Sequence, residues 1–223
     1  MANSREGLVS VNRTELLAFY DDPLPDEQGM NATAVNAVAG EEFGLVLLLR
    51  YFADSGIDAT RLDGPCTTGR MRGHRLDAWV RTPEILYQVE VKNWSAHSFG
   101  GTHFPLDATE TAGREHRKAI WNEYWDRDRS TFVDKPAAKV LTRMKPPCRD
   151  DRIEPLIAFW VSLHPEGDAE PFFSFPLRNG SFDHVNVFSM STYLRSLTLD
   201  ELELPLPKTH ARLTVLDRIF VRR

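Results

Sequence analysis

Two segments in which apolar and polar side chains alternate, residues 74–81 and 86–94, most constrain the fold of this chain. The alternating apolar residues are Leu76, Ala78 and Val80 in the first segment and Val89 and Val91 in the second. An alternation of period two is typical of a β-strand with one buried face. Residues 82–84, Thr-Pro-Glu, favour a turn between the segments. The sequence therefore predicts a β-hairpin.

The register of this hairpin brings charged side chains together. A connecting loop of two or four residues places Ala78 opposite Val89 and Asp77 opposite Glu90, with both carboxylates on one face. Directly opposed like charges destabilise a strand pair, so a compensating group is expected. Lys92 is two residues after Glu90 and projects from the same face, about 6.6 Å further along the strand. Two acids and one lysine are therefore predicted to share a small patch.

Such a patch is suited to one kind of chemistry. Two carboxylates from neighbouring strands, supplemented by a main-chain oxygen and water, suit a hard cation such as Mg²⁺. A lysine beside them can hold or help to deprotonate a water molecule, and the cation stabilises charge that develops on a phosphate. The expected reaction is hydrolysis of a phosphodiester bond. The alternative is an exposed strand pair in which Glu90, Lys92 and Asp77 have only a solvated, structural role.

The rest of the chain predicts a mixed α/β protein. Residues 1–30 are polar and form an expected N-terminal arm or short helix (14–20), and residues 31–223 are expected to form a single domain. Residues 33–54 carry apolar side chains at intervals of three and four and predict a buried helix, with Gly56 as its C-cap. A second helix is expected at 107–126. Further strands are expected at 138–144, 156–163, 172–176 and 185–189, followed by a short helix at 192–197 and a last strand at 213–221.

The motif that combines these features is Arg75-Leu76-Asp77, twelve intervening residues and Glu90-Val91-Lys92, preceded by a helix that bears acids. It resembles the PD-(D/E)xK nuclease superfamily, whose fold is restriction-endonuclease-like: a mixed β-sheet core flanked by helices. Leu76 stands where the family commonly has proline, and the Q-x-x-x-Y pattern of some branches is absent. The resemblance covers roughly residues 33–125.

The resemblance implies a role for individual residues. Asp77 and Glu90 would bind the metal, Lys92 would act on the attacking water, and Val91 would give at most its carbonyl oxygen. A glutamate of the preceding helix often completes such a site; Glu42 is preferred over Glu41 because it precedes Leu45 and Leu49 on the buried stripe. The basic residues expected to approach the nucleic-acid backbone are Arg70, Arg72, Arg75, Arg114, Arg117 and Lys118.

The charge distribution permits a nucleic-acid partner although the chain has a net charge of -5. Residues 1–60 hold 3 basic and 10 acidic side chains, whereas residues 61–81 hold 5 and 2, residues 110–152 hold 11 and 8, and residues 208–223 hold 5 and 1. Basic stretches can thus form one phosphate-binding face inside an acidic total. On charge alone, solvated helices and loops are the favoured interpretation of this distribution.

Other features narrow the setting. Cys66 and Cys148 have no C-x-x-C partner and favour a reducing compartment, and residues 1–30 lack the pattern of a secretion signal, so we expect a cytoplasmic location. The longest apolar run, residues 45–49, is too short to span a membrane. The sequence hypothesis is a nuclease that uses Mg²⁺, with Mn²⁺ as a substitute. The resemblance favours DNA over RNA as its substrate, although the residues themselves do not distinguish the two. The resemblance also implies a role in restriction, repair or phage defence, as a homodimer or with an accessory protein. The alternative is an inactive nuclease-fold module that binds nucleic acid or a protein.

Overall fold

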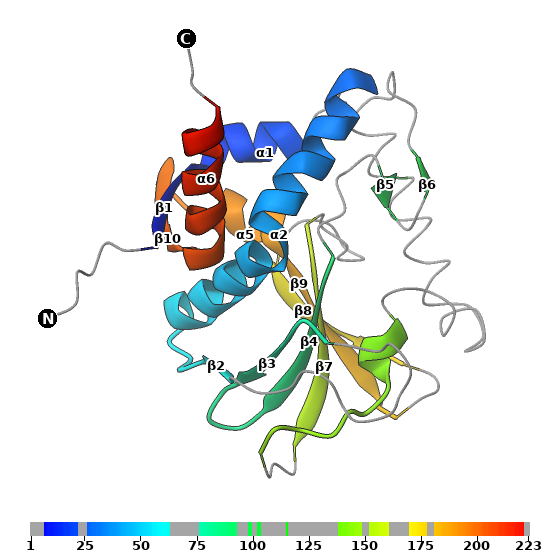
Figure 1. The fold of residues 1–223 in the computed structure, drawn as a ribbon. Helices are drawn as coiled ribbons and strands as arrows, with labels where there is room; N and C mark the ends of the chain where they lie inside the picture. The colour runs from blue at the N-terminus through cyan, green and yellow to red at the C-terminus, as the bar shows by residue number, and fades with distance from the viewer. Residues whose placement is uncertain are drawn as a thin grey trace, which may run out of the picture.

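Six strands form one mixed β-sheet in the order β2-β3-β4-β7-β9-β8 (Figure 1). The strands are β2 (Thr60–Leu62), β3 (Ala78–Arg81), β4 (Leu86–Lys92), β7 (Ile153–Phe159), β8 (Phe172–Pro176) and β9 (His184–Ser189). β2, β3 and β4 form an antiparallel meander, β4, β7 and β9 are parallel, and β8 is antiparallel to β9. The expected mixed α/β class is therefore confirmed.

The computed structural model describes residues 7–21, 26–62, 76–92, 98–99, 102–103, 115, 138–148, 152–160, 170–177 and 181–220. The helices are α1 (Arg13–Asp21), α2 (Asp26–Asp54), the 3-10 helix η1 (Ala138–Leu141), α5 (Met190–Ser196) and α6 (Pro207–Ile219). The remaining strands are β1 (Leu8–Asn12), β5 (Ser98–Phe99), β6 (Thr102–His103) and β10 (Glu201–Pro205). Of the expected helix at 107–126, only residue 115 is described, and it is helical; the other residues lie outside the described ranges. None of the helices that the structure describes is long and apolar enough to cross a bilayer.

The hairpin has the predicted register. Ala78 is opposite Val89 and Val80 is opposite Tyr87, as expected from the alternation. The connection is four residues long, and the Thr82 N–H donates to the Ile85 carbonyl at 2.9 Å. Because a shift of one residue would turn every side chain to the other face, the buried valines hold this register.

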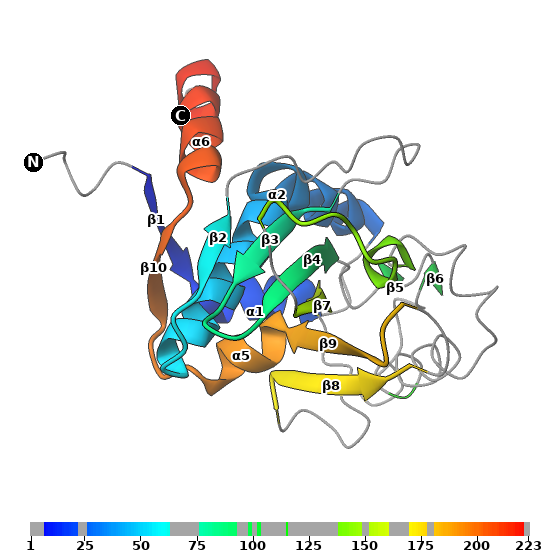
Figure 2. The same ribbon diagram turned by 90° about the horizontal axis from the view of Figure 1, so that it is seen from below.

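The centre of the sheet is fully covered. All seven residues of β7 are buried, which is typical of a parallel strand with layers on both faces. Helix α2 lies across one face and contacts β4 and β7 (Figures 1 and 2). Aromatic side chains hold it there: the ring centroids of Phe52 and Tyr87 are 5.7 Å apart, and those of Tyr51 and Phe188 are 5.4 Å apart.

Helix α2 ends as the sequence predicts. The Ile57 N–H donates to the Phe52 carbonyl at 2.8 Å and the Gly56 N–H to the Ala53 carbonyl at 3.0 Å, which together form a Schellman motif. Gly56 has φ of 73°, a left-handed conformation that favours glycine at this position. The helix begins at Asp26, seven residues earlier than the apolar spacing indicated.

Two strand predictions were wrong. Residues 138–144 hold the 3-10 helix η1 because the buried Gln88 side chain, rather than a neighbouring strand, bonds their backbone: Gln88 donates to the Thr142 carbonyl at 2.9 Å and accepts from the Met144 N–H at 3.1 Å. Residues 213–219 belong to helix α6, which starts with Pro207 in its first turn. Proline is favoured there because the missing N–H has no helical partner in any case.

The N-terminal segment is part of the fold. The expected short helix is α1, and β1 forms a two-stranded antiparallel ribbon with β10, in which Leu8 is opposite Pro205. In β10 Leu202 and Leu204 are buried and alternate with exposed glutamates. The ribbon joins segments close to the two ends of the chain.

A buried carboxylate ties β7 to β9. The Glu154 side chain, 10% exposed, accepts hydrogen bonds from Asn186 Nδ2 at 2.9 Å, His184 Nε2 at 3.1 Å and Arg152 Nε at 3.0 Å. Burial raises the pKa of Glu154, but the three hydrogen bonds outweigh it and hold that pKa below its ordinary value. The charged form is therefore more stable in the folded protein than in the unfolded chain.

Glu154→Gln should consequently destabilise the protein in a pH-dependent way. A depressed pKa contributes stability above the unfolded value of about 4.3, and this contribution is lost as the pH falls through the folded value. We expect a loss of about 1–2 kcal/mol at neutral pH, measured by urea unfolding, that shrinks below about pH 4. Glu203→Gln, an exposed change on β10, is the matched control. A loss that is the same at neutral and acidic pH would contradict the assignment.

Candidate functional site

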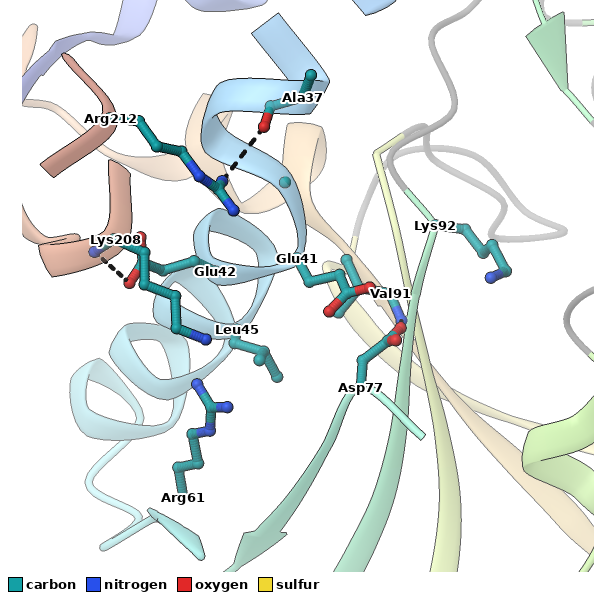
Figure 3. Close-up of a pocket in the computed structure, with 11 residues that line it drawn as sticks. Ala37, Glu41, Glu42, Leu45, Arg61, Asp77, Val91, Lys92, Lys208 and Arg212 are labelled. Carbon is teal, nitrogen blue, oxygen red and sulfur yellow. Dashed lines mark hydrogen bonds between the residues drawn. The ribbon is translucent and has the colours of Figure 1, made fainter. Parts of the chain in front are cut away.

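The candidate site lies at the edge of the sheet where β4 ends and the chain enters β3. A cavity of about 460 Å³ opens there, between α2, α6 and the meander (Figure 3). Its lining residues are Ala37, Gly40, Glu41, Glu42, Leu45, Arg61, Asp77, Val91, Lys92, Lys208 and Arg212. The carboxyl ends of parallel strands are a common location of ligand sites in α/β proteins.

Asp77 is held at the seam between β3 and β4. The regular ladder ends with Ala78 opposite Val89, one pair before Asp77. The Asp77 N–H donates to the Val89 carbonyl at 3.2 Å, and Asp77 Oδ2 accepts from the Val91 N–H at 2.7 Å. The carboxylate thus takes the place of a main-chain acceptor for β4. This contact fixes Asp77 beside Val91, which also lines the cavity.

Glu90 and Lys92 form an ion pair along one face of β4. Lys92 Nζ donates to Glu90 Oε1; the Glu90 side chain is 0% exposed and that of Lys92 is 16% exposed. The alternative of an exposed strand pair is therefore wrong. Burying two charges costs free energy that their attraction does not always return. Figure 3 shows the Lys92 ammonium turned away from Glu41 and Asp77.

A break in α2 directs Glu41 into the cavity. Gly40 has φ of 51° and ψ of -148°, which lie outside the helical region, so the two halves of α2 meet at a kink. A side chain would strain this conformation, whereas glycine adopts it readily. Just after the kink, the Glu41 carboxylate points toward Asp77 and Val91 (Figure 3). Two carboxylates from different elements thus face one cavity.

Glu42, the preferred helix acid in the sequence, has a different role in the structure. Its carboxylate accepts from the backbone N–H groups of Lys208, at 3.0 Å, and Thr209, at 2.8 Å, and from Thr209 Oγ1 at 2.9 Å. Leu206, the N-cap of α6, has no side-chain hydrogen bond, so Glu42 satisfies the first N–H groups of that helix from outside. Glu41, rather than Glu42, is the acid that accompanies Asp77.

The other expected site residues fall into two groups. The basic residues proposed for backbone contacts, Arg70, Arg72, Arg75, Arg114, Arg117 and Lys118, lie outside the described residues. Glu90 pairs with Lys92, and its expected place among the metal ligands stays a prediction. Within the described ranges, no group of three His, Cys, Asp or Glu side chains could hold a metal ion. A metal cage made by the protein alone is therefore absent from the described part of the chain.

Two carboxylates nevertheless fit one class of cation. Mg²⁺ keeps several waters and is usually held by one or two carboxylates together with substrate phosphates. Glu41 and Asp77 supply that number of hard oxygen ligands on one cavity wall. The donor set suits Mg²⁺ or Mn²⁺ and contains none of the thiolates that softer metals prefer.

Three cationic residues of the cavity were not predicted. Arg61 comes from β2, and Lys208 and Arg212 come from α6. The excess of basic residues after position 207 was a signal for the latter two, but the strand expected at 213–221 obscured their place on a helix. Leu213, Leu216 and Phe220 are spaced by three and four, which is the helical period that this assignment missed.

Comparisons with known proteins gave no match: no protein-family model, no curated protein and no solved structure is significantly similar to this chain.

The separate roles of the two neighbouring glutamates predict different effects on stability. Glu42→Ala should lower the free energy of unfolding by about 1–2 kcal/mol, because it removes three accepted hydrogen bonds and leaves the first N–H groups of α6 without their acceptor. Glu41→Ala, an exposed change one residue away, should cost less than about 0.5 kcal/mol. Urea unfolding of both variants measures the difference. Equal losses would show that Glu42 does not act as the cap of α6.

Proposed function

We propose that this protein is a metal-dependent nuclease that hydrolyses phosphodiester bonds, with DNA as the favoured substrate. Glu41 and Asp77 hold the divalent cation, and Lys92 orients the attacking water. The ion pair with Glu90 holds Lys92 at the end of β4. The finer fold assignment, restriction-endonuclease-like, belongs to the same proposal.

One observation carries the proposal: the buried ion pair of Glu90 and Lys92 directly adjoins the contact between Asp77 and Val91. Asp77 precedes the second strand of the meander and Glu90 lies on the third, the arrangement that the D-x(12)-E-x-K spacing led us to expect. A helix acid points toward Asp77, although it is Glu41 and not Glu42 (Figure 3). These four side chains come from three elements whose register is fixed by a buried core.

Each residue of the proposed site would have a separate role in hydrolysis. When bound, a divalent cation supplies Lewis-acid stabilisation of charge on the phosphate. Asp77 is preorganised for its part because the Val91 N–H already fixes its carboxylate. The Lys92 side chain lines the cavity and is 16% exposed. After a rotation of this side chain, its ammonium can donate to a water in the cavity.

A second candidate is an inactive module that binds nucleic acid through this cavity. It is favoured by the ammonium of Lys92, which is turned away from Glu41 and Asp77, and by the small number of acids that the described residues bring together. Both candidates use the same surface, and cleavage separates them.

Cleavage of plasmid DNA and of oligonucleotide duplexes in Mg²⁺ or Mn²⁺ tests the proposal. The wild type should cut, and Asp77→Asn, Glu41→Gln and Lys92→Ala should each lower the rate by roughly 100-fold or more, the scale of a lost acid–base or charge-stabilising group. Activity should disappear on addition of a chelator and return with excess Mg²⁺.

Lys145→Ala, an exposed change outside the cavity, is the control and should cut like the wild type. A wild-type protein that binds duplex DNA but cuts nothing with either metal would favour the inactive module. Undiminished cutting by Lys92→Ala would exclude the assigned role of that residue.

A further inference from the structure

The cavity has a cationic wall as well as an acidic one. Arg61, Lys208 and Arg212 line it together with Glu41 and Asp77. Arg212 is already engaged: its Nη1 donates to the Val38 carbonyl at 2.6 Å and to the Ala37 carbonyl at 3.2 Å. These two carbonyls lie just before the break at Gly40. Arg212 therefore stabilises the kink, and the ligand-binding capacity of this wall rests on the other two cations.

Arg61 and Lys208 converge on one part of the cavity. Figure 3 shows the Arg61 guanidinium and the Lys208 ammonium directed toward each other beside Leu45. Both residues are exposed, and in the part of the chain that the structure describes neither side chain has an ion-pair or hydrogen-bond partner. Two exposed cations normally gain by pointing apart into solvent. Their convergence suits an anion that binds between them.

The backbone holds both cations at this point. Arg61 is in β2, where it is paired with Val80 on the strand that leads from Asp77. Lys208 is in the first turn of α6, and its own N–H donates to Glu42. Glu42, which the sequence analysis preferred as a metal ligand, thus fixes the helix that carries Lys208 to the cavity. Neither position depends on a long loop.

We propose that Arg61 and Lys208 form a phosphate subsite of the nucleic-acid backbone, beside the phosphate that a cation held by Glu41 and Asp77 would contact. The inference rests on the proposed nuclease function and names the substrate contact that it needs. A nucleic-acid strand carries a phosphate at every nucleotide, so one strand can place successive phosphates on the two walls. A cavity of this volume, with acids for a cation on one wall and cations for an anion on the other, matches such a repeating ligand.

Binding of a fluorescent DNA duplex, measured by anisotropy as a function of salt in a chelating buffer, tests the subsite without cleavage. Each phosphate contact contributes about 0.9 to the slope of log affinity against log salt. Arg61→Gln and Lys208→Gln should each reduce that slope by about 1, and the double variant by about 2. The loss should be equal for two duplexes of unrelated sequence, because phosphate contacts carry no base information.

Lys145→Gln removes the same charge from an exposed position outside the cavity and should leave the slope unchanged. Arg61→Lys and Lys208→Arg keep the charge and should restore it. Wild-type slopes in both Gln variants, or an equal loss in Lys145→Gln, would overturn the subsite.

The cleavage assay separates this outcome from the failure of the proposed function. Reduced slopes in a protein that cuts nothing would keep the phosphate subsite and reject the nuclease. Normal cutting by Arg61→Gln and Lys208→Gln with wild-type slopes would keep the nuclease and reject the subsite.

Discussion

The parallel ladder between β4 and β7 is the constraint on which the rest of the structure depends. It runs from Leu86 opposite Ile153 to Lys92 opposite Phe159, and β3 pairs with the other edge of β4 from Leu86 to Val89, so this part of β4 is an interior strand. An interior strand must be covered on both faces, and this requires α2 on one of them. The same ladder fixes where β4 ends relative to β7, with Lys92 opposite Phe159. Glu90 and Lys92 are thereby carried to the border between core and solvent.

The alternation of apolar and polar residues was sufficient to predict the hairpin, because side chains of a strand point alternately to the two faces of the sheet. The valines of β4 leave one register that buries them, and the positions of Glu90 and Lys92 follow from it, whereas Asp77 lies just beyond the ladder and is fixed by the Val91 N–H. The period of α2 was equally visible. It favoured Glu42 over Glu41, because the break at Gly40, which turns the helix just before them, is not visible in that spacing. The non-helical conformation of Gly40 cannot be predicted from the spacing of apolar residues.

Other errors have tertiary causes. The segment near Val140 is apolar and resembles a strand, but its backbone is bonded by Gln88, a side chain fifty residues away in the sequence. In α6 the helical spacing was present, yet most of its apolar side chains are exposed. Residues 213–221 were wrongly predicted as a strand because their apolar side chains were assumed to be buried. The excess of basic residues after position 207 was visible in the sequence. The arrangement of the cavity's charges on two facing walls depends on α6, whose position only the folded chain reveals.

The ribbon of β1 and β10 has a consequence for the order in which the molecule assembles. Its two strands come from opposite ends of the chain, and closing so long a loop carries an entropic cost that other contacts must offset first. The hairpin and its neighbours need far shorter loops. We therefore expect the acids of the sheet edge to be in place before α6 docks on Glu42. Lys208 and Arg212 of the cationic wall then reach the cavity last, after Arg61 of the meander, and the binding surface is complete only when β1 has paired with β10.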